Sequence, residues 1–473
     1  MRNNKAITPR NEDFSKWYTD VVKAARLAEY SPIRGCMVFE PNGYAIWENI
    51  QRIINKYFME LGIKNVYMPM LIPESLLSNE KNLVEGFSPE VAWVTAGGEE
   101  QLTERLAIRP TSETLFGDYF SKRVQSYKDL PILNNQWCSV LRWEKSSRPF
   151  LRNREFLWQE GHTVHASKTE AIKLTDKMIE IYRDFVENFL AIPVICGRKT
   201  ESEKFAGAEF TNTIEALMYN GYTLQAGTSH YLGQNFAKAY DIKFADKDGK
   251  IKYAYTTSWG ISTRLIGGLI MVHGDNSGLI LPPKIAPVQV AIVPITKDEE
   301  VFETCRSLYN YISDFDIKVE IDKSDKSAGQ KFAESEVQGI PIRLEIGKRD
   351  LKDNTFVMVS RDIGEKQTIK LNDKCANAII KELSAIQKRM FDRARTRISE
   401  LTFSATTIDE MLDQINKQPG FIEADWCGNE SCEKKLKEAG SIKSRCIKGK
   451  NKGGVCVVCG EPAKNSVVWG LQY

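Results

Sequence analysis

Apolar residues near the start of the chain follow first a helical period and then the period of a strand. Between residues 47 and 61 they recur three or four positions apart, which predicts an amphipathic helix. They stand at Ile50, Ile53, Ile54, Phe58 and Leu61. Gly62 is placed to end this helix. Residues 66–71 then read as a strand, and Pro69 within it indicates an edge or interface position, because proline donates no ladder hydrogen bond.

Strand and helix patterns alternate in the middle of the chain. Apolar runs at 288–293, 317–321 and 340–346 predict strands. Residues 301–312 and the stretch around Phe332 predict helices between them. Alternation at this spacing is typical of βαβ units around a largely parallel sheet.

Breaks in these patterns divide the chain into three parts. A length of 473 residues suggests about three domains. A proline-containing run at 279–283 closes an aromatic-rich first part, and a long helix near 376–401 opens the last. We therefore expect an α/β multidomain protein with domains at residues 1–285, 286–390 and 391–473.

The composition indicates a cytoplasmic location and does not decide whether the protein binds nucleic acid. The chain is 42% hydrophobic and 27% charged, which is normal for a folded cytosolic protein. No stretch approaches the ~20 apolar residues of a membrane helix, and the first residues lack the apolar run of a signal peptide. We therefore expect a cytoplasmic protein. A net charge of +3 neither demands nor excludes a nucleic-acid partner.

Arginines gather between two predicted strands. Arg142, Arg148, Arg152 and Arg154 lie within thirteen residues, among aromatic and aliphatic neighbours. A solvated charged loop would account for them. Buried arginine needs a partner, however, and a guanidinium fork fits phosphate oxygens. Such a hairpin could hold a triphosphate bent over a sheet.

Two other segments carry candidate chemistry. Residues 258–269 predict a turn entering an apolar helix that contains Arg264. That side chain either snorkels to water or is presented to a phosphate. The second segment, residues 109–113, follows a short strand signal at 106–108. Its Thr111 and Ser112 before Glu113 also match an ordinary helix N-terminus.

Together these segments resemble the motifs of class II aminoacyl-tRNA synthetases. The helix and strand ending near Pro69 resemble motif 1, Arg142-Trp143-Glu144 with its hairpin resembles motif 2, and residues 260–268 around Arg264 resemble motif 3. Arg-Pro-Thr-Ser-Glu at 109–113, Phe-Leu-Trp-Gln-Glu-Gly-His at 156–162 and Gln-Ala-Gly-Thr-Ser-His at 225–230 are similar to segments of prolyl-tRNA synthetases of the archaeal and eukaryotic type. The resemblance runs from about residue 14 to Tyr473. It implies a class II antiparallel sheet with flanking helices, an α/β anticodon-binding domain and a small zinc-binding C-terminal α/β domain.

The resemblance also implies an activity and residue roles. L-Proline would be activated with ATP and Mg²⁺, and the prolyl group transferred to tRNA(Pro) by a homodimer. Arg142 and Arg264 would be catalytic, with Arg142 at the α-phosphate. The implied ATP contacts are Arg142, Glu144, Arg152, Gln225, Thr228 and Arg264. The implied proline contacts are Thr111, Glu113, Arg142, Trp158, Glu160, His162, Phe205 and His230. No general base is needed, because the carboxylate of proline is ionised at neutral pH.

Half of the ten cysteines crowd the C-terminus. The pairs Cys427/Cys432 and Cys456/Cys459 have zinc-ligand spacing, although ordinary thiols remain an alternative. The resemblance implies a structural Zn²⁺ on these four. Cys446 is either a bystander or a substitute ligand, and basic neighbours would favour its thiolate. The scattered cysteines are predicted to be small buried hydrophobes: Cys36, Cys138, Cys196, Cys305 and Cys375.

Residues 286–385 resemble an anticodon-binding domain. Guanine recognition calls for arginine, lysine or a carboxylate at base edges. Arg343, Glu345 and Arg361 are candidates, and a solvated strand edge explains them as well. The helix that follows is decorated with basic side chains, which either contact phosphates or solvate a helix face: Lys388, Arg389, Arg393, Arg395 and Arg397.

The chain ends at Tyr473, which the resemblance turns back toward the active site. The interval from Arg142 to Arg264 leaves no room for a further domain, so we expect no editing in cis. We also expect weak activation of alanine or cysteine.

Three other functions compete with this interpretation. A threonyl enzyme is disfavoured by the Thr111–Glu113 pair and by the lack of zinc-ligand residues in the amino-acid pocket. An inactive paralogue would have lost one of the phosphate-binding arginines, and all are present. A zinc-dependent nucleic-acid-binding module leaves most of the chain unexplained.

Overall fold

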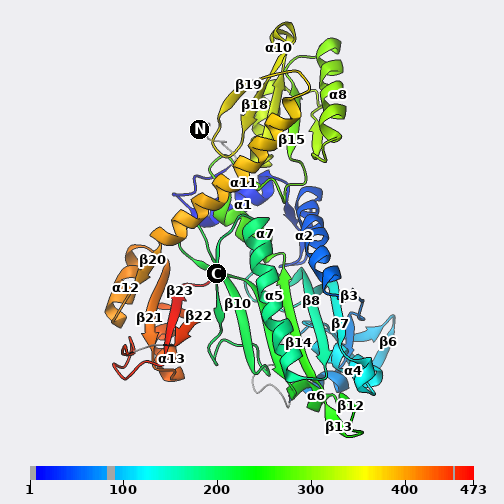
Figure 1. Cartoon of the computed structure of the whole chain (residues 1–473), viewed down its shortest axis with the longest axis vertical. Coiled ribbons are helices and arrows are strands. Elements are labelled where there is room, and N and C mark those ends of the chain that lie inside the picture. The colour runs from blue at the N-terminus through cyan, green and yellow to red at the C-terminus, as the bar shows by residue number, and fades with distance from the viewer. Residues whose placement is uncertain (1–6, 82–90, 451–452) are drawn as a thin grey trace.

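The computed structural model describes residues 7–81, 91–450 and 453–473. A sheet of eleven strands runs through the lower half of the molecule, in the order β20-β21-β23-β22-β9-β10-β11-β14-β8-β7-β3 (Figure 1). On the catalytic side neighbouring strands are antiparallel, except that β3 pairs parallel with β7. These strands are β3 (Lys64–Asn65), β7 (Ile132–Leu141), β8 (Glu155–His165), β9 (Val194–Arg198), β10 (Phe210–Leu217), β11 (Thr223–Gly233) and β14 (Tyr255–Ser262).

Helices with apolar faces pack on this sheet. They are α2 (Pro41–Glu60), α5 (Lys168–Asn188) and α7 (Arg264–His273). Trp47 of α2 and Tyr182 of α5 belong to the same core as Trp259 of β14. Gly161 of β8 makes room for that indole, since a Cβ at this position would lie 2.1 Å from the ring. Glycine is therefore required here by close packing.

The first predicted helix is confirmed and the strand after it is wrong. Helix α2 spans the predicted residues, and Gly62 follows it with φ +73°, the left-handed conformation that ends many helices. Residues 66–70 are irregular, between β3 and β4 (Leu71–Pro73). The amide of Met68 donates to the side chain of Gln136 (2.8 Å) instead of to a neighbouring strand.

Smaller elements complete the first part of the chain. They are α1 (Phe14–Ala24), β1 (Ala28–Tyr30), β2 (Met37–Phe39), α3 (Glu74–Lys81), β5 (Trp93–Gly97), β6 (Glu100–Ile108), α4 (Glu113–Arg123), a 3₁₀ helix (Tyr127–Asp129), α6 (Asn235–Ala239), β12 (Lys243–Ala245) and β13 (Ile251–Tyr253).

The middle part forms a separate five-stranded sheet at the top of Figure 1, in the order β16-β15-β17-β18-β19. All three predicted strands and both predicted helices are present. The prediction of a largely parallel sheet is only half correct. β16 and β17 pair parallel with β15, whereas β18 and β19 add antiparallel strands. Antiparallel neighbours need no crossover, and connections of eight and five residues lead to these two strands. The elements are β15 (Val290–Pro294), α8 (Glu299–Ser313), β16 (Val319–Ile321), α9 (Ala328–Val337), β17 (Ile342–Ile346), α10 (Lys348–Asp353), β18 (Thr355–Ser360) and β19 (Lys366–Lys370).

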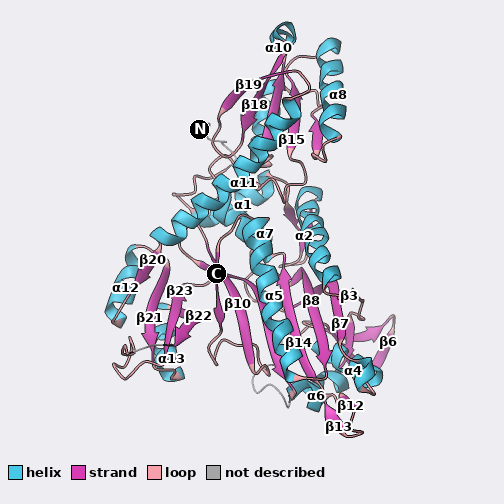
Figure 2. Ribbon diagram, viewed as in Figure 1, coloured by secondary structure: helices cyan, strands magenta, loops and turns pink. Residues whose placement is uncertain are grey.

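A long helix, α11 (Cys375–Glu400), leads from this domain to the C-terminal module (Figure 2). The predicted boundary at residue 390 falls inside it. The module contains β20 (Thr402–Ser404), α12 (Ile408–Lys417), β21 (Phe421–Trp426), α13 (Glu430–Gly440), β22 (Lys443–Lys450) and β23 (Asn465–Gly470). Its strands continue the catalytic sheet, because Ile447 of β22 pairs with Arg198 of β9. This continuity has no signal in the sequence.

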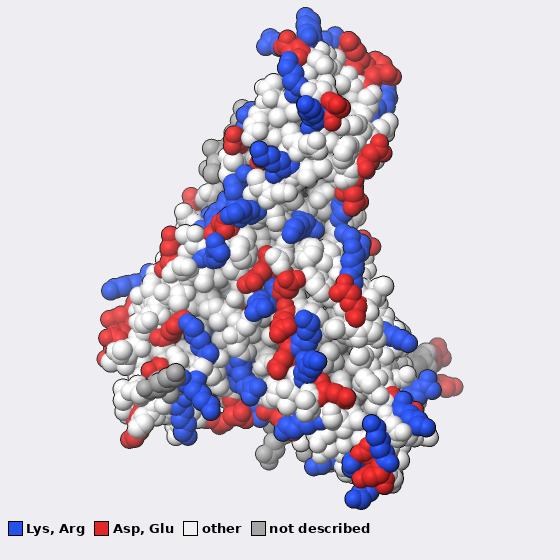
Figure 3. Space-filling view, in the orientation of Figure 1, with Lys and Arg blue, Asp and Glu red and all other residues white. Residues whose placement is uncertain are grey.

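Within the described ranges, no helix is long and apolar enough to cross a membrane. Positive and negative side chains are interspersed over most of the face in Figure 3, as the small net charge suggests.

Candidate active site

A cleft of about 490 Å³ opens over the catalytic sheet. Segments from the start of α4 to the start of α7 line it, and it collects nearly all of the residues that the sequence proposed for the active site. Those at its wall are Thr111, Glu113, Arg142, Glu144, Trp158, Glu160, His162, Phe205, Gln225, Thr228, His230 and Arg264. Arg152 instead lines an adjoining cavity of about 510 Å³, which shares Glu144 and Arg264 with the cleft. Residues up to 153 positions apart, Thr111 and Arg264, are thus brought to one surface.

Arg142 and Arg264 are the main cations of the cleft. Arg142 follows the end of β7, and its Nε donates to the carbonyl of Pro110 (3.0 Å). Its guanidinium lies 5.2 Å from the centre of the Trp158 ring. Arg264 is the first residue of α7, and its Nε donates to the carbonyl of Leu151 (3.3 Å). The predicted turn before this helix is only one residue long, at Thr263, because β14 runs to Ser262. Arg264 stands at the helix start instead of within it.

Neither arginine forms an ion pair with a carboxylate in the described part of the chain. Burial lowers the pKa of Arg142, and nearby carboxylates oppose this. Burial, followed by repulsion from Arg142, lowers the pKa of Arg264 to about 10. Two guanidinium ions in the cleft without a carboxylate partner among the described residues make it attractive to an anion.

The hairpin between β7 and β8 holds the third phosphate candidate. Arg152 Nε donates to Glu144 (2.8 Å), and Arg148 pairs with Arg152 through their backbones. The Arg152 side chain is more than half exposed. It can therefore swing between Glu144 and a ligand at little energetic cost.

At the other end of the cleft, Thr111 and Glu113 offer oxygen acceptors. Helix α4 begins at Glu113, as the alternative reading of this segment predicted. The hydroxyl of Thr111 donates to the Glu113 carboxylate, and both side chains are buried. Arg109, from the same segment, is structural: its guanidinium donates to the carbonyls of Met68 (2.6 Å) and Ser139 (2.9 Å).

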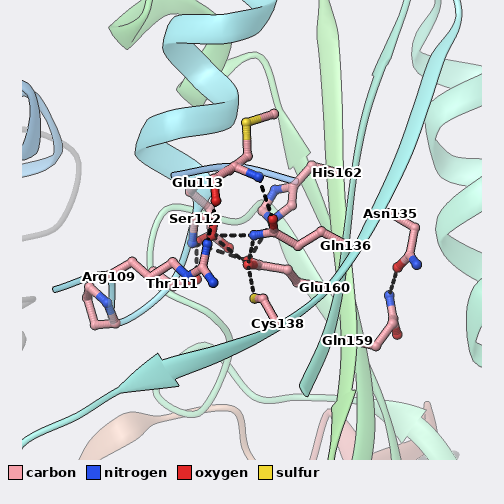
Figure 4. A network of polar contacts seen from close by, with 12 residues as sticks. Arg109, Thr111, Ser112, Glu113, Asn135, Gln136, Cys138, Gln159, Glu160 and His162 are labelled. Carbon is pink, nitrogen blue, oxygen red and sulfur yellow. Dashed lines mark hydrogen bonds and ion pairs between the residues drawn. The ribbon is translucent and has the colours of Figure 1, made fainter. Parts of the chain in front are cut away.

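Glu160 is saturated by neighbours and cannot act alone on a ligand (Figure 4). Its Oε1 accepts from Ser112 Oγ (2.5 Å) and Gln136 Nε2 (2.7 Å), and its Oε2 lies 3.0 Å from His162 Nε2. Burial raises the pKa of Glu160, but these hydrogen bonds outweigh it and lower the pKa overall. The carboxylate therefore stays charged and holds the start of α4 against the sheet.

Sequence reasoning missed Ser112 and Gln136 as parts of this network. Gln136 stands opposite Glu160 in the ladder between β7 and β8. The signal was the polar run Asn134-Asn135-Gln136 inside an otherwise strand-like segment, because buried amides in a strand need partners.

The two histidines of the cleft pack against aromatic rings. His162 stacks on Phe116 with ring centres 4.1 Å apart. His230 contacts Phe205 (4.7 Å), and its Nδ1 lies 2.9 Å from Thr211 Oγ1. Burial lowers the pKa of His230 to about 3. It therefore shapes the apolar end of the cleft without adding charge.

The C-terminal tyrosine lies beside the cleft. Tyr473 Oη accepts from Asn220 Nδ2 (2.8 Å), and the Tyr473 amide donates to the carbonyl of Thr223 (3.2 Å). Its ring is 5.4 Å from the Arg148 guanidinium, at the adjoining cavity.

The four predicted zinc ligands form one cluster. The Sγ atoms of Cys427, Cys432, Cys456 and Cys459 lie within 4.8 Å of one another. Two of the separations are 3.7 and 3.8 Å. A tetrahedron with Zn–S bonds of about 2.3 Å has sulfur–sulfur edges of about 3.8 Å, so the spacing fits zinc. Burial opposes ionisation of Cys456, but backbone amides lower its pKa to about 7.

Cys446 lies outside this cluster and is fully buried. The expectation that basic neighbours favour its thiolate is wrong. Burial, and then Glu215, raise the pKa of Cys446 to about 12. The charge of neighbouring Arg445 is already engaged by Glu215. Of the scattered cysteines, Cys138, Cys305 and Cys375 are buried, and Cys36 and Cys196 are partly buried.

The proposed anticodon residues are buried and paired. Arg343 contacts Glu345 (2.9 Å) and Glu336 (3.1 Å). Arg361 forms a two-point ion pair with Asp275, at 2.7 and 2.9 Å, which ties the middle domain to the catalytic part. A solvated strand edge does not describe them, and base reading would require these pairs to open.

An antiparallel sheet whose cleft is lined by two arginines without a carboxylate partner among the described residues, one after β7 and one at the start of α7, defines the catalytic core of a class II aminoacyl-tRNA synthetase. Comparison with known families agrees. Residues 93–273 match the class II tRNA synthetase core domain (G, H, P, S and T), residues 289–381 the anticodon-binding domain, and residues 408–473 the C-terminal domain of prolyl-tRNA synthetase.

Comparison with full-length relatives identifies the family within this class. The chain is 54% identical to the proline–tRNA ligase of Lachnoclostridium phytofermentans over 480 residues, covering 100% of both chains. It is 53% identical to that of Clostridium novyi, covering 99% of this chain and 98% of the other. The crystal structure of prolyl-tRNA synthetase from Cryptosporidium parvum with halofuginone and AMPPNP is similar with a TM-score of 0.94 and 39% identity, covering 99% of each chain. The chain belongs to the prolyl-tRNA synthetase family.

Proposed function

We propose that the chain activates L-proline with ATP and transfers the prolyl group to the 3′ end of tRNA(Pro). One observation carries this proposal: among the described residues, Arg142 and Arg264 have no carboxylate partner, and they line the same cleft as the Thr111–Glu113 acceptor pair. Unpaired cations suit a triphosphate. A buried carboxylate with a hydroxyl suits a cationic secondary amine.

The arrangement suits in-line displacement. A carboxylate oxygen of proline attacks the α-phosphorus, the new O–P bond forms, and the bond to the β-phosphate oxygen breaks to release pyrophosphate. Arg142 faces the α-phosphate, where charge builds up in the transition state, while Arg264 and Arg152 hold the outer phosphates. Glu113 and Thr111 accept from the proline ammonium, and the rings of Trp158, Phe205 and His230 enclose the pyrrolidine. Glu160 and His162 fix this pocket.

Magnesium enters with ATP and neutralises phosphate oxygens. Mg²⁺ prefers oxygen ligands, which fits the carboxylates Glu144 and Glu203 on the cleft wall. The close group Glu113, Glu160 and His162 fits it less well, because a histidine nitrogen takes part and Glu160 is already saturated.

The test is pyrophosphate exchange into ATP with each of the twenty amino acids in the absence of tRNA. We expect strong exchange with proline. Strong exchange with another amino acid instead would agree with a class II synthetase but contradict the assignment of the pocket to proline. Absence of exchange with every amino acid, together with absence of tRNA charging, would contradict the proposal.

We place the chain in the archaeal and eukaryotic type, with domains at 1–285, 286–390 and 391–473. Each matched family range falls within one of these domains. Between Arg142 and Arg264 the chain builds α5, β9–β11, α6, β12 and β13 around the catalytic sheet, and this stretch is described throughout. It contains no additional domain.

Because no editing module interrupts the core, purified protein is expected to leave alanyl-tRNA(Pro) intact. Alanine should support exchange weakly, since each missing methylene gives only about 10–200-fold discrimination. Deacylation of alanyl-tRNA(Pro) is measured against buffer alone. A rate clearly above buffer with the purified chain would overturn this prediction.

The cysteine cluster is proposed to hold one structural Zn²⁺, because four thiolates leave no open position for water. Cys456→Ser is expected to lose bound zinc and to lower the unfolding temperature of the C-terminal module. Zinc content is measured by mass spectrometry of the purified protein. Cys36→Ser, outside the cluster, should retain the metal. A wild-type protein that is fully folded without zinc would argue against the site.

A homodimer and a cytoplasmic location remain proposals. Exposed apolar side chains at the predicted motif 1 support the first: Met59, Tyr67 and Met70 are 74%, 72% and 45% exposed. The cytoplasmic location is supported by the proposed reaction, which needs tRNA and ATP.

A further inference from the structure

A second, smaller cavity lies where the catalytic part, the middle domain and helix α11 meet. It has a volume of about 180 Å³. Its wall includes Arg10 from the N-terminal segment, Tyr219 after β10, Asp275 after α7, Asp362 after β18, and Arg393 and Arg397 of α11. In Figure 1, α11 runs diagonally past α1 and α7 at this junction. The catalytic residues described above do not contribute to it.

Two of its arginines share one aromatic ring. The guanidinium carbon of Arg10 lies 3.2 Å from the centre of the Tyr219 ring, and that of Arg397 lies 3.8 Å from it. Arg10 is largely buried, and burial, with repulsion from Arg397, lowers its pKa. Two cations on one phenol ring repel each other unless an anion joins them.

The nearby carboxylates do not supply that anion. Asp275 is held by both arms of Arg361, at 2.7 and 2.9 Å. Asp362 is held by both arms of Arg389, at 2.8 and 2.9 Å, and lies 3.4 Å from Arg393. Within the described ranges, neither Arg10 nor Arg397 forms an ion pair, and Arg10 Nε is buried without a hydrogen-bond partner.

We propose that this cavity binds a phosphate group. Guanidinium donors match phosphate oxygens in geometry as well as in charge. The volume is below the 300–1,000 Å³ of pockets for drug-sized ligands, so it suits a phosphate group and not a whole nucleotide. Either a free phosphate ion or a backbone phosphate of a tRNA can supply this chemistry.

Occupancy would tie three parts of the chain together. Arg10 belongs to the N-terminal segment, and Arg397 belongs to the helix that links the middle domain to the C-terminal module. A phosphate between them replaces repulsion with attraction. It therefore stabilises the relative placement of the domains that Arg361 and Asp275 already join.

The test uses Arg397→Gln in the full-length protein, with Arg395→Gln as the matched control. Arg395 is two residues away on α11, exposed, and paired with Asp392. Inorganic phosphate is titrated calorimetrically at constant ionic strength. Phosphate binding in the catalytic cleft is common to all three proteins, so the difference between them reports this cavity. A second arm measures tRNA binding against salt concentration and rests on the proposed function, whereas the phosphate arm does not.

Loss of one phosphate equivalent, or an affinity at least tenfold weaker, in Arg397→Gln alone supports a free-ion site. Unchanged phosphate binding, with a salt dependence of tRNA binding that falls by about one counterion in Arg397→Gln alone, supports a backbone phosphate. Equal behaviour of both variants in both arms overturns the proposal. If Arg397→Gln does not fold, Arg10→Gln, which removes the other cation on the Tyr219 ring, takes its place with the same readouts.

Discussion

Replacing Arg142 by alanine is expected to lower proline-dependent pyrophosphate exchange by about 100- to 1,000-fold, as loss of one preorganised donor to a developing anion does. The loss should appear mainly in kcat, because the charge on the α-phosphate grows in the transition state. The exchange rate of Arg142→Lys should lie between those of the wild type and Arg142→Ala, since lysine keeps the charge but loses the two-pronged guanidinium geometry.

Stability separates a catalytic role from a structural one. Arg142 is a cation without an ion-pair partner in the described ranges, and desolvation in the cleft lowers its pKa. Removing it relieves a desolvation cost, so the unfolding temperature of Arg142→Ala should equal or exceed that of the wild type. The exposed Arg123→Ala serves as the control for arginine loss. Full exchange activity in Arg142→Ala, or activity lost together with stability, would contradict the assigned role.

Residues with chemical motifs were predictable because their local sequence carries the signal. Arg142, Arg264 and the Thr111–Glu113 pair stand in short segments whose order resembles one family, and the structure places them in one cleft. The amphipathic helix α2 and the βαβ start of the middle domain follow from hydrophobic periods of 3.6 and 2. Local pattern is sufficient for these features.

Long-range pairing was not predictable. The partner of Glu160 is Gln136 across a strand ladder, and the partner of Arg361 is Asp275 in another domain. Polar contacts of this kind depend on how distant segments meet in the fold, and neither spacing nor composition specifies that. For the same reason, nothing in the sequence indicated that β22 extends the catalytic sheet through β9.

The same limit explains why the thiolate predicted at Cys446 is wrong. Its basic neighbours in the sequence suggested a reactive thiolate, but Arg445 turns to Glu215, 230 residues away, and the thiol is buried in an apolar cluster with Leu217 and Val468. Charge at neighbouring positions affects a thiol only if the folded chain leaves that charge unpaired.

This Arg445–Glu215 contact belongs to a buried cluster for which a large stability effect is expected. Glu215 accepts from Lys199 Nζ (2.8 Å) and from Arg445 Nε and Nη2 (3.0 and 2.8 Å), and all three side chains are almost fully buried. Arg445 comes from the C-terminal module and Glu215 from β10, so the cluster fastens the module to the catalytic sheet. Burial opposes ionisation of Glu215, but Lys199 and Arg445 outweigh it and lower its pKa. The stabilisation is therefore fully present above the ordinary carboxyl pKa and is lost only as the pH falls through the lowered value.

Glu215→Gln leaves two buried cations without a counter-charge, and the free energy of unfolding is expected to fall by about 3–5 kcal/mol. The triple variant Lys199→Met, Glu215→Leu, Arg445→Met removes every buried charge and should recover most of this loss, because well-packed apolar replacements of buried ion pairs are often neutral. Denaturant unfolding at neutral pH measures both. Glu423→Gln breaks the more exposed pair with Lys448 in the same module and should cost about 1 kcal/mol or less. If Glu215→Gln behaves like Glu423→Gln, the buried cluster does not fasten the module, and the strand ladder and the other contacts across this boundary, such as that of Thr200 with Glu433, hold it to the catalytic sheet.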